Sequence, residues 1–344
     1  MVVGAGLLVA TRGDSDDATV ATARDRTAST ARTPPSVTVP ATEAPTTALP
    51  APTPAATAAP PPAAGPPFAV GTARTTAEDK SRSTAARGST PASASRTLPL
   101  TVRYPASGSA GSENDGAAAA AGRFPLVVFA HGYDIAAADY AGFLRDLAAQ
   151  GFVVAAPDFP RSSTAFPGPP TQADIDEQAR DAGFLVSAFT NGSVPGPWSG
   201  HLADGEAGVV GHSDGGNTAA RVASNSCCFD ARFGAAVILS GDEGTSGGEW
   251  AVGGSPPMLL VQGTADSINP WSLSQELYDD AASPKTLVAI DGAGHLEPYT
   301  SGPQRRAIVA LVSAFLRARL VDPATLAQVT DRANRDGLRV AASS

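Results

Sequence analysis

Short apolar runs alternate with stretches of helical periodicity over most of the chain. Residues 124–130 (FPLVVFA) and a run that begins at residue 152 (FVVAAP) are apolar throughout, with a helix-period stretch over 138–150 between them. Strands that are apolar on both faces are typical of a parallel sheet covered by helices on each side. The same reasoning predicts further strands over 68–72, 96–104, 207–210, 235–239, 258–262 and 286–290, and helices over 173–189, 217–224, 273–281 and 304–319.

This order predicts one α/β domain over residues 68–322, doubly wound around a mostly parallel sheet. We expect residues 323–344 to form a C-terminal helix or tail. Residues 11–67 are mostly Ala, Thr and Pro. Because they carry too few large apolar side chains to offset the entropy of ordering, we predict a disordered tether. The first ten residues, MVVGAGLLVA, resemble the apolar core of a secretion signal or anchor without its preceding basic residues. We expect a secreted or surface-tethered protein; an Ala- and Val-rich unstructured start is the alternative.

Composition excludes several classes of protein. The 24 basic and 33 acidic residues give a net charge of -9, which disfavours a nucleic-acid partner. No apolar run reaches the roughly 18 residues of a membrane span. The four histidines lack metal-site spacing, so we expect neither a metal ion nor a cofactor. We also expect the protein to be a monomer. Cys227 and Cys228 are adjacent, and we interpret one or both as buried, non-catalytic thiols. Their redox state stays open, since a disulfide between neighbours would distort the intervening peptide.

The sequence GHSDGG places Ser213 directly after the predicted strand 207–210 and before a predicted helix. This is the G-x-S-x-G pattern of a nucleophile on a tight strand-turn-helix bend, where glycines relieve steric overlap. A second match, at Ser246, is followed by no helix, and we interpret it as a flexible loop. The sequence therefore predicts Ser213 as a nucleophile.

A serine hydroxyl needs a base and an orienting carboxylate. Asp266 follows the predicted strand 258–262, and His295 follows the predicted strand 286–290. Taken singly, each residue is more typical of a turn. Together, in the order Ser213, Asp266, His295, they predict a catalytic triad, with Asp242 as the rival acid.

The oxyanion of such a reaction needs backbone donors. The predicted strand 124–130 ends in His131-Gly132-Tyr133, so we expect the N–H groups of Tyr133 and Asp214 to supply them. We interpret His131 and His212 as structural, His201 as a surface residue and Asp158 as a carboxylate that fixes a loop.

The segment 124–160, together with GHSDGG, QGTADSINP and GAGH, resembles the α/β-hydrolase fold serine esterases. Within that fold, residues 95–320 are similar to a bacterial branch of platelet-activating-factor acetylhydrolase-like, chlorophyllase-like, cutinase-like and dienelactone-hydrolase-related enzymes. The resemblance implies hydrolysis of carboxylic esters through an acyl-enzyme. It departs from dienelactone hydrolases proper, which use a cysteine nucleophile, and from the acetylhydrolases, whose acid usually lies one strand earlier, at the place of Asp242.

Loop lengths bear on the substrate. The short, Gly- and Ser-rich segment 240–257 leaves no room for the helical lid of many lipases. We therefore expect an open site that takes short acyl esters or exposed polymeric esters, with Tyr133, Phe159 and Trp271 as substrate contacts. Phe166, Trp198 and Trp250 are further candidates for its edge, although scattered aromatics most often serve packing. A peptidase or amidase on the same fold, and a non-catalytic surface protein, are the alternatives.

Overall fold

The computed structural model describes residues 65–244, 247–335 and 337–344. The chain divides into two units, Met1–Thr57 and Ala58–Ser344, and every described element belongs to the second. The predictions for residues 1–10 and for residues 11–64 of the tether, as well as Ser246, lie outside the described residues. Among the described helices, none has the length and apolar character to cross a membrane.

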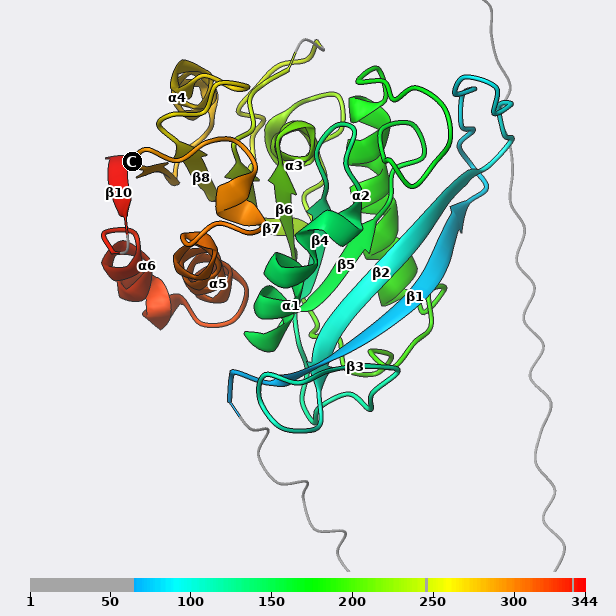
Figure 1. The fold of residues 1–344 in the computed structure, drawn as a ribbon, viewed down its shortest axis with the longest axis horizontal. Helices are drawn as coiled ribbons and strands as arrows, with labels where there is room; N and C mark the ends of the chain where they lie inside the picture. The colour runs from blue at the N-terminus through cyan, green and yellow to red at the C-terminus, as the bar shows by residue number, and fades with distance from the viewer. Residues whose placement is uncertain (1–64, 245–246, 336) are drawn as a thin grey trace, which may run out of the picture. The chain divides into compact units, whose positions relative to one another are not determined.

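A ten-stranded sheet forms the centre of the domain, in the order β10-β9-β8-β7-β6-β4-β5-β2-β1-β3 (Figure 1). Strands β4 to β9 are mutually parallel, whereas β2 pairs antiparallel with β1 and β5, and β10 pairs antiparallel with β9. The bounds are Ala69–Asp79 (β1), Arg96–Ala106 (β2), Glu113–Asp115 (β3), Leu126–Ala130 (β4), Val153–Pro157 (β5), Ala207–His212 (β6), Phe233–Leu239 (β7), Met258–Gly263 (β8), Lys285–Ile290 (β9) and Leu338–Ser343 (β10).

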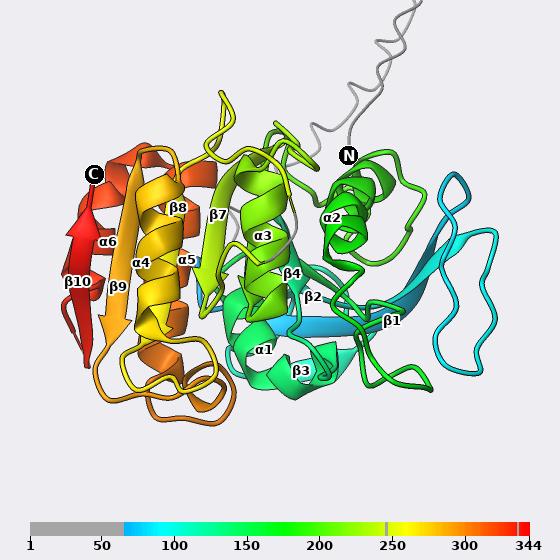
Figure 2. The same ribbon diagram turned by 90° about the horizontal axis from the view of Figure 1, so that it is seen from above.

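Helices cover both faces of this sheet. The α-helices are Ala141–Ala149 (α1), Ile175–Thr190 (α2), Asp214–Ser224 (α3), Trp271–Asp280 (α4), Arg305–Leu320 (α5) and Leu326–Arg332 (α6), with 3₁₀ turns at Ala137–Tyr140, Glu297–Tyr299 and Pro323–Thr325. One apolar cluster joins the sheet to α2, α3 and α4, and a second joins it to α1, α5 and α6. Figure 2 shows α3 and α4 across the sheet from α5 and α6. The predicted doubly wound, mostly parallel α/β fold is confirmed.

The end of the chain differs from the sequence prediction. Residues 323–344 contain a helix, α6, but also the strand β10, which pairs with β9 and extends the sheet. The α/β domain therefore continues beyond residue 322. Between β7 and β8, the described residues 240–244 and 247–257 form no helix.

Candidate active site

A sharp bend presents Ser213 at the carboxyl end of β6. Its backbone has φ 55° and ψ -125°, a conformation that costs energy for any residue with a side chain. A Cβ atom at Gly211 would overlap the carbonyl of Gly215, and one at Gly215 would overlap the carbonyl of Ala130. The two glycines are thus required for α3 to start this close to β4 and β6.

Ser213, His295 and Asp266 form one hydrogen-bonded chain. The His295 Nε2 atom lies 2.9 Å from the Ser213 Oγ atom, and its Nδ1 atom lies 2.8 Å from an Asp266 carboxylate oxygen. Because an ionised carboxylate only accepts, His295 carries its proton on Nδ1, and Nε2 accepts from the serine hydroxyl. The structure therefore brings together the three side chains that the sequence singled out.

Asp266 is held as an anion. Burial alone would raise its pKa, but the hydrogen bond from His295 and those from the Asn269 and Ile268 backbone N–H groups hold the pKa below its ordinary value. Asp242, the rival acid, instead accepts from the Gly244 N–H at 2.7 Å and makes no described contact with His295.

The two backbone N–H groups predicted as oxyanion donors belong to the segments next to Ser213. The Tyr133 N–H has no acceptor among the described residues. The Asp214 N–H begins α3, where the first N–H groups have no partner within the helix. A Cβ atom at Gly132 would lie 3.2 Å from the Ser213 Cβ atom, so the loop after β4 lies directly against the nucleophile.

Hydrogen bonds from His131 and to Tyr140 fix the Gly132 peptide on that loop. The His131 Nδ1 atom donates to the Gly132 carbonyl at 2.7 Å, and its Nε2 atom accepts from the Phe159 N–H at 3.0 Å. On the other side, the Gly132 N–H donates to the Tyr140 hydroxyl at 3.3 Å.

From Tyr140 the same hydrogen-bond chain continues to His295. The Tyr140 hydroxyl donates to the His212 Nδ1 atom at 2.8 Å, and the His212 Nε2 atom donates to the carbonyl of His295 at 2.9 Å. Burial, together with the neighbouring His295, lowers the pKa of His212 to about 3, so its ring is neutral. The sequence indicated structural roles for both buried histidines but not this connection.

The flanking carboxylate Asp214 is buried beside the nucleophile. Burial raises its pKa, against the hydrogen bond that Gln172 donates to one carboxylate oxygen at 2.9 Å. Its other oxygen is buried with no hydrogen-bond partner among the described residues. The remaining predicted polar residues fit their interpretations, because Asp158 accepts from the Ala137 N–H and the Ser163 hydroxyl, and His201 is not buried.

The predicted aromatic edge is only partly present. The Tyr133 side chain is 40% exposed, and Trp271 is half-buried at the start of α4. Phe159 is fully buried against His131, so its prediction as a substrate contact is wrong. Trp198 is also buried, and it packs against Tyr104 and Phe189. Ile268, 66% exposed and two residues after Asp266, was missed because an isolated exposed apolar residue gives no sequence pattern.

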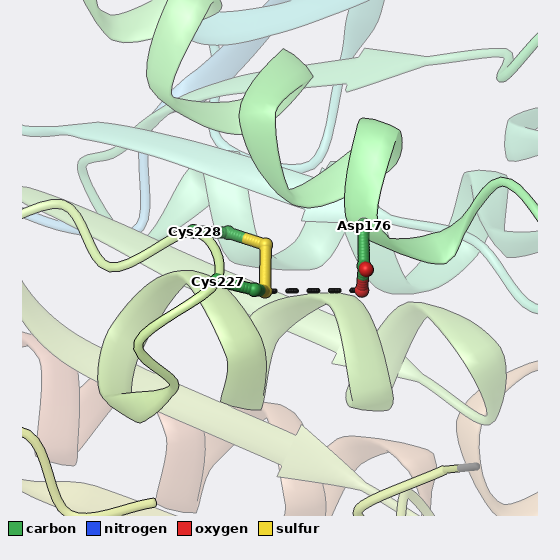
Figure 3. Close-up of side chains that lie close together, drawn as sticks. All are labelled: Asp176, Cys227 and Cys228. Atoms are coloured by element: carbon green, nitrogen blue, oxygen red, sulfur yellow. Dashed lines mark hydrogen bonds between the residues drawn. A yellow bond between two sulfur atoms is a disulfide. The ribbon is translucent and has the colours of Figure 1, made fainter. Parts of the chain in front are cut away.

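The cysteine pair, whose redox state the sequence left open, is oxidised. Cys227 and Cys228 form a disulfide and are half-buried, not buried thiols, at the turn that follows α3 (Figure 3). Asp176 lies 3.8 Å from the Cys227 sulfur. Arg221 forms an ion pair with Asp176 at 3.3 Å, so a cation already occupies the carboxylate that a metal would use. Oxidised sulfurs are poor metal ligands, since the thiolate is the ligating form.

Three comparisons place the fold among known proteins. A family model named Chlorophyllase matches residues 116–267, a range that contains Ser213 and Asp266. Two curated relatives, both the uncharacterized protein YfhR, from Escherichia coli K12 and O157:H7, are 38% identical over 60 residues. The match spans 17% of this chain and only 21% of the length of each relative.

Among solved structures, a ferulic acid esterase from Streptomyces cinnamoneus superposes with a TM-score of 0.62 at 21% identity. The superposition covers 80% of this chain and 97% of that one. Together with the chlorophyllase match, it supports the enzyme class predicted from the sequence, a carboxylic ester hydrolase. The chain has the α/β-hydrolase fold, and its resemblance to the esterases of that fold is confirmed.

Proposed function

We propose that the protein hydrolyses carboxylic esters with Ser213 as nucleophile, His295 as general base and acid, and Asp266 as the orienting anion. The observation that carries the proposal is the hydrogen-bonded chain from Asp266 through His295 to the Ser213 Oγ atom, at 2.8 and 2.9 Å. These are the distances at which a base can take up the proton of a nucleophile.

The geometry supports the following reaction. The Ser213 Oγ atom attacks the ester carbonyl carbon while its proton passes to His295 Nε2, and the N–H groups of Tyr133 and Asp214 stabilise the oxyanion. His295 then gives the proton to the leaving alcohol, and an acyl-serine remains. Water, activated by the same histidine, releases the acid and restores Ser213.

We propose short acyl esters or exposed polymeric esters as substrates. The described residues between β7 and β8 build no helix over Ser213, and Tyr133 and Ile268 offer exposed apolar surface in the loops that carry the site. The name of the structural neighbour, a ferulic acid esterase, supports ester chemistry and adds feruloyl esters to the compounds worth assaying.

The test is hydrolysis of p-nitrophenyl esters of increasing acyl length, with a methyl ferulate assay and a p-nitroanilide beside them. We expect ester turnover that Ser213→Ala reduces to background while the fold is retained, since the substitution removes one hydroxyl and empties no core. Ser246→Ala, in the second G-x-S-x-G match, is the control and keeps wild-type activity. Anilide turnover equal to ester turnover, or loss of activity only in Ser246→Ala, would refute the proposal.

A further inference from the structure

A cavity of about 500 Å³ lies outside the candidate active site. Its walls come from α1, α5, α6 and the start of β1, and none of Ser213, Asp266 and His295 lines it. Helices α1 and α6 both contact α5, on the face of the sheet opposite α3 and α4 (Figure 1). The reaction proposed above uses no residue of this cavity, so its role is a separate question.

One face of α5 forms the length of the cavity. Arg306, Val309, Ala310, Ser313 and Arg317 recur at helical spacing and all line it. Eleven residues separate the two arginines, which is about 16 Å along a helix. The apolar part of the lining therefore lies between two cationic ends. It is completed by Phe68, Val70 and Ala314, which are buried in the domain.

The charge of the lining is opposite to that of the chain. Four arginines, at positions 145, 306, 317 and 332, line the cavity, with Asp146 as the single acid. Asp146 is already paired, because Arg145 lies 2.7 Å and Arg305 lies 3.3 Å from its carboxylate oxygens. In a protein of net charge -9, an excess of arginine around one cavity favours an anionic ligand.

The remaining three guanidinium groups are available to a ligand. Arg306 and Arg332 are exposed, and their guanidinium groups form no ion pair or hydrogen bond with any described residue. Arg317 donates to the carbonyl of Gln150 at 2.5 Å and pairs with no carboxylate in the described part of the chain. A guanidinium presents donors in a planar fork that fits the two oxygens of a carboxylate.

A buried hydroxyl points to a ligand independently of charge. Ser313 is 5% exposed, lines the cavity, and its Oγ atom is buried with no partner among the described residues. Leaving such a group unsatisfied costs about 1–3 kcal/mol. A polar atom of a bound molecule would satisfy it once the side chain turned toward the cavity.

We propose that this cavity binds a single-chain or aromatic carboxylic acid. The carboxylate pairs with an arginine at one end, and the apolar body lies along Val309, Ala310 and Ala314. The apolar part of the lining favours an organic anion over a small inorganic one, and the volume is that of a site for one small molecule. None of Ser213, Asp266 and His295 lines this cavity, so the proposal does not depend on the proposed function.

The test is isothermal titration calorimetry of the full chain with decanoate, beside decanol and decyltrimethylammonium. Ser213→Ala protein is titrated in parallel, so that binding is measured without turnover. We expect saturable binding of decanoate, weakened by added salt, with at least tenfold weaker binding of the alcohol and of the cation.

Two variants locate the site. In the first, Arg306→Gln, Arg317→Gln and Arg332→Gln are combined, and we expect at least a tenfold loss of decanoate affinity. Its matched control combines Arg74→Gln, Arg123→Gln and Arg335→Gln, which remove the same charge from exposed arginines elsewhere. The second variant, Ala310→Phe, fills the apolar part without changing charge and should also abolish binding.

Circular dichroism checks that each variant is folded. If the triple variant does not fold, Ala310→Phe still tests the proposal. Equal affinity for decanoate and decanol, equal losses in the triple variant and its control, or full binding by Ala310→Phe would overturn the proposal. Loss of ester turnover in Ser213→Ala with unchanged decanoate binding supports both sites separately. Absence of turnover in wild type would refute the proposed function alone.

Discussion

Three histidines lie around Ser213, and their hydrogen-bond partners assign a different role to each ring. His131 and His212 each donate to a backbone carbonyl and use the second nitrogen to accept from a backbone N–H or a tyrosine hydroxyl. His295 alone has an accepting nitrogen directed at the Ser213 hydroxyl. Of the three, only this ring can take the serine proton without breaking a bond that holds the loops.

Replacing Asp266 by Asn should lower kcat by about 10⁴, because the amide no longer favours the His295 tautomer that accepts from Ser213. The equivalent change at the rival, Asp242→Asn, should lower kcat less than tenfold, or about 1 kcal/mol, since its carboxylate accepts from the Gly244 N–H and bonds no triad residue in the described part of the chain. Steady-state kinetics on one p-nitrophenyl ester measures both. A larger loss at Asp242 would move the acid to the end of β7.

The buried neutral His212 should make the fold sensitive to mild acid. Its pKa is lowered from 6.5 to about 3, so the unfolded chain binds a proton that the folded chain excludes. The free energy of unfolding should therefore fall as pH drops below 6.5, by up to about 1.4 kcal/mol per pH unit from this group. We expect His212→Gln to be less stable at pH 7 but to show a shallower decline between pH 6.5 and 5.

Urea unfolding at several pH values in that interval gives both slopes. Most carboxylates titrate below this interval in the unfolded chain, so they contribute little to the difference between the proteins. Parallel slopes in wild type and variant would contradict a neutral His212 in the fold.

The triad could be predicted at this scale because its order along the chain and its positions after strands are sequence properties. The Tyr140–His212 connection could not, because it depends on where the turn before α1 places a hydroxyl. Phe159 illustrates the same limit: its position at the end of β5 was correct, but its side chain turns into the core against His131.

At the scale of elements, the loop after β4 and the loop after β9 are joined through β6. Tyr140, before α1, bonds the Gly132 N–H, and His212, the last residue of β6, bonds the carbonyl of His295. The same hydrogen-bond chain thus positions the loop of the proposed oxyanion donor and the proposed base, His295. A substitution that displaces the loop after β4 should therefore also displace His295 in the loop after β9.

Tyr140→Phe tests this coupling. The variant removes the shared hydroxyl, and we expect kcat to fall about tenfold with KM changed less than twofold, because the loss affects orientation and not substrate contact. Tyr104→Phe is the matched control, since it also removes a buried tyrosine hydroxyl, one bonded to the carbonyl of Ala117 far along the chain from the site. An equal loss of kcat in the two variants would contradict the coupling, because it would show that losing any buried tyrosine hydroxyl lowers kcat by destabilising the fold.

Most elements followed from the sequence, and the exceptions share a cause. The strands β4 to β9 are apolar on both faces and were predicted, with ends displaced by a few residues. Strand β10 alternates buried and exposed positions at the sheet edge, a weak pattern in six residues after a helix. The disulfide likewise depends on how the turn after α3 directs two side chains, which composition does not report.

For the whole molecule, a protein that begins at Gly65 should hydrolyse small esters with the kcat and KM of the full chain. All strands and helices described here lie between Ala69 and Ser343, and the triad lies within them. Kinetics and thermal unfolding of the two proteins side by side make the measurement. A shorter protein that fails to fold, or whose KM rises several-fold, would show that residues before Gly65 contribute to the domain or its site.

The pairing of β10 with β9 also decides how this enzyme could be attached to a support. Ser344 exchanges backbone hydrogen bonds with Lys285 at 2.9 and 3.0 Å, at the amino end of β9. His295 follows the carboxyl end of the same strand. A linker fused to Ser344 would therefore leave from the edge of the sheet opposite the triad, so that molecules anchored to a bead or an electrode by this end would present Ser213 to the solution.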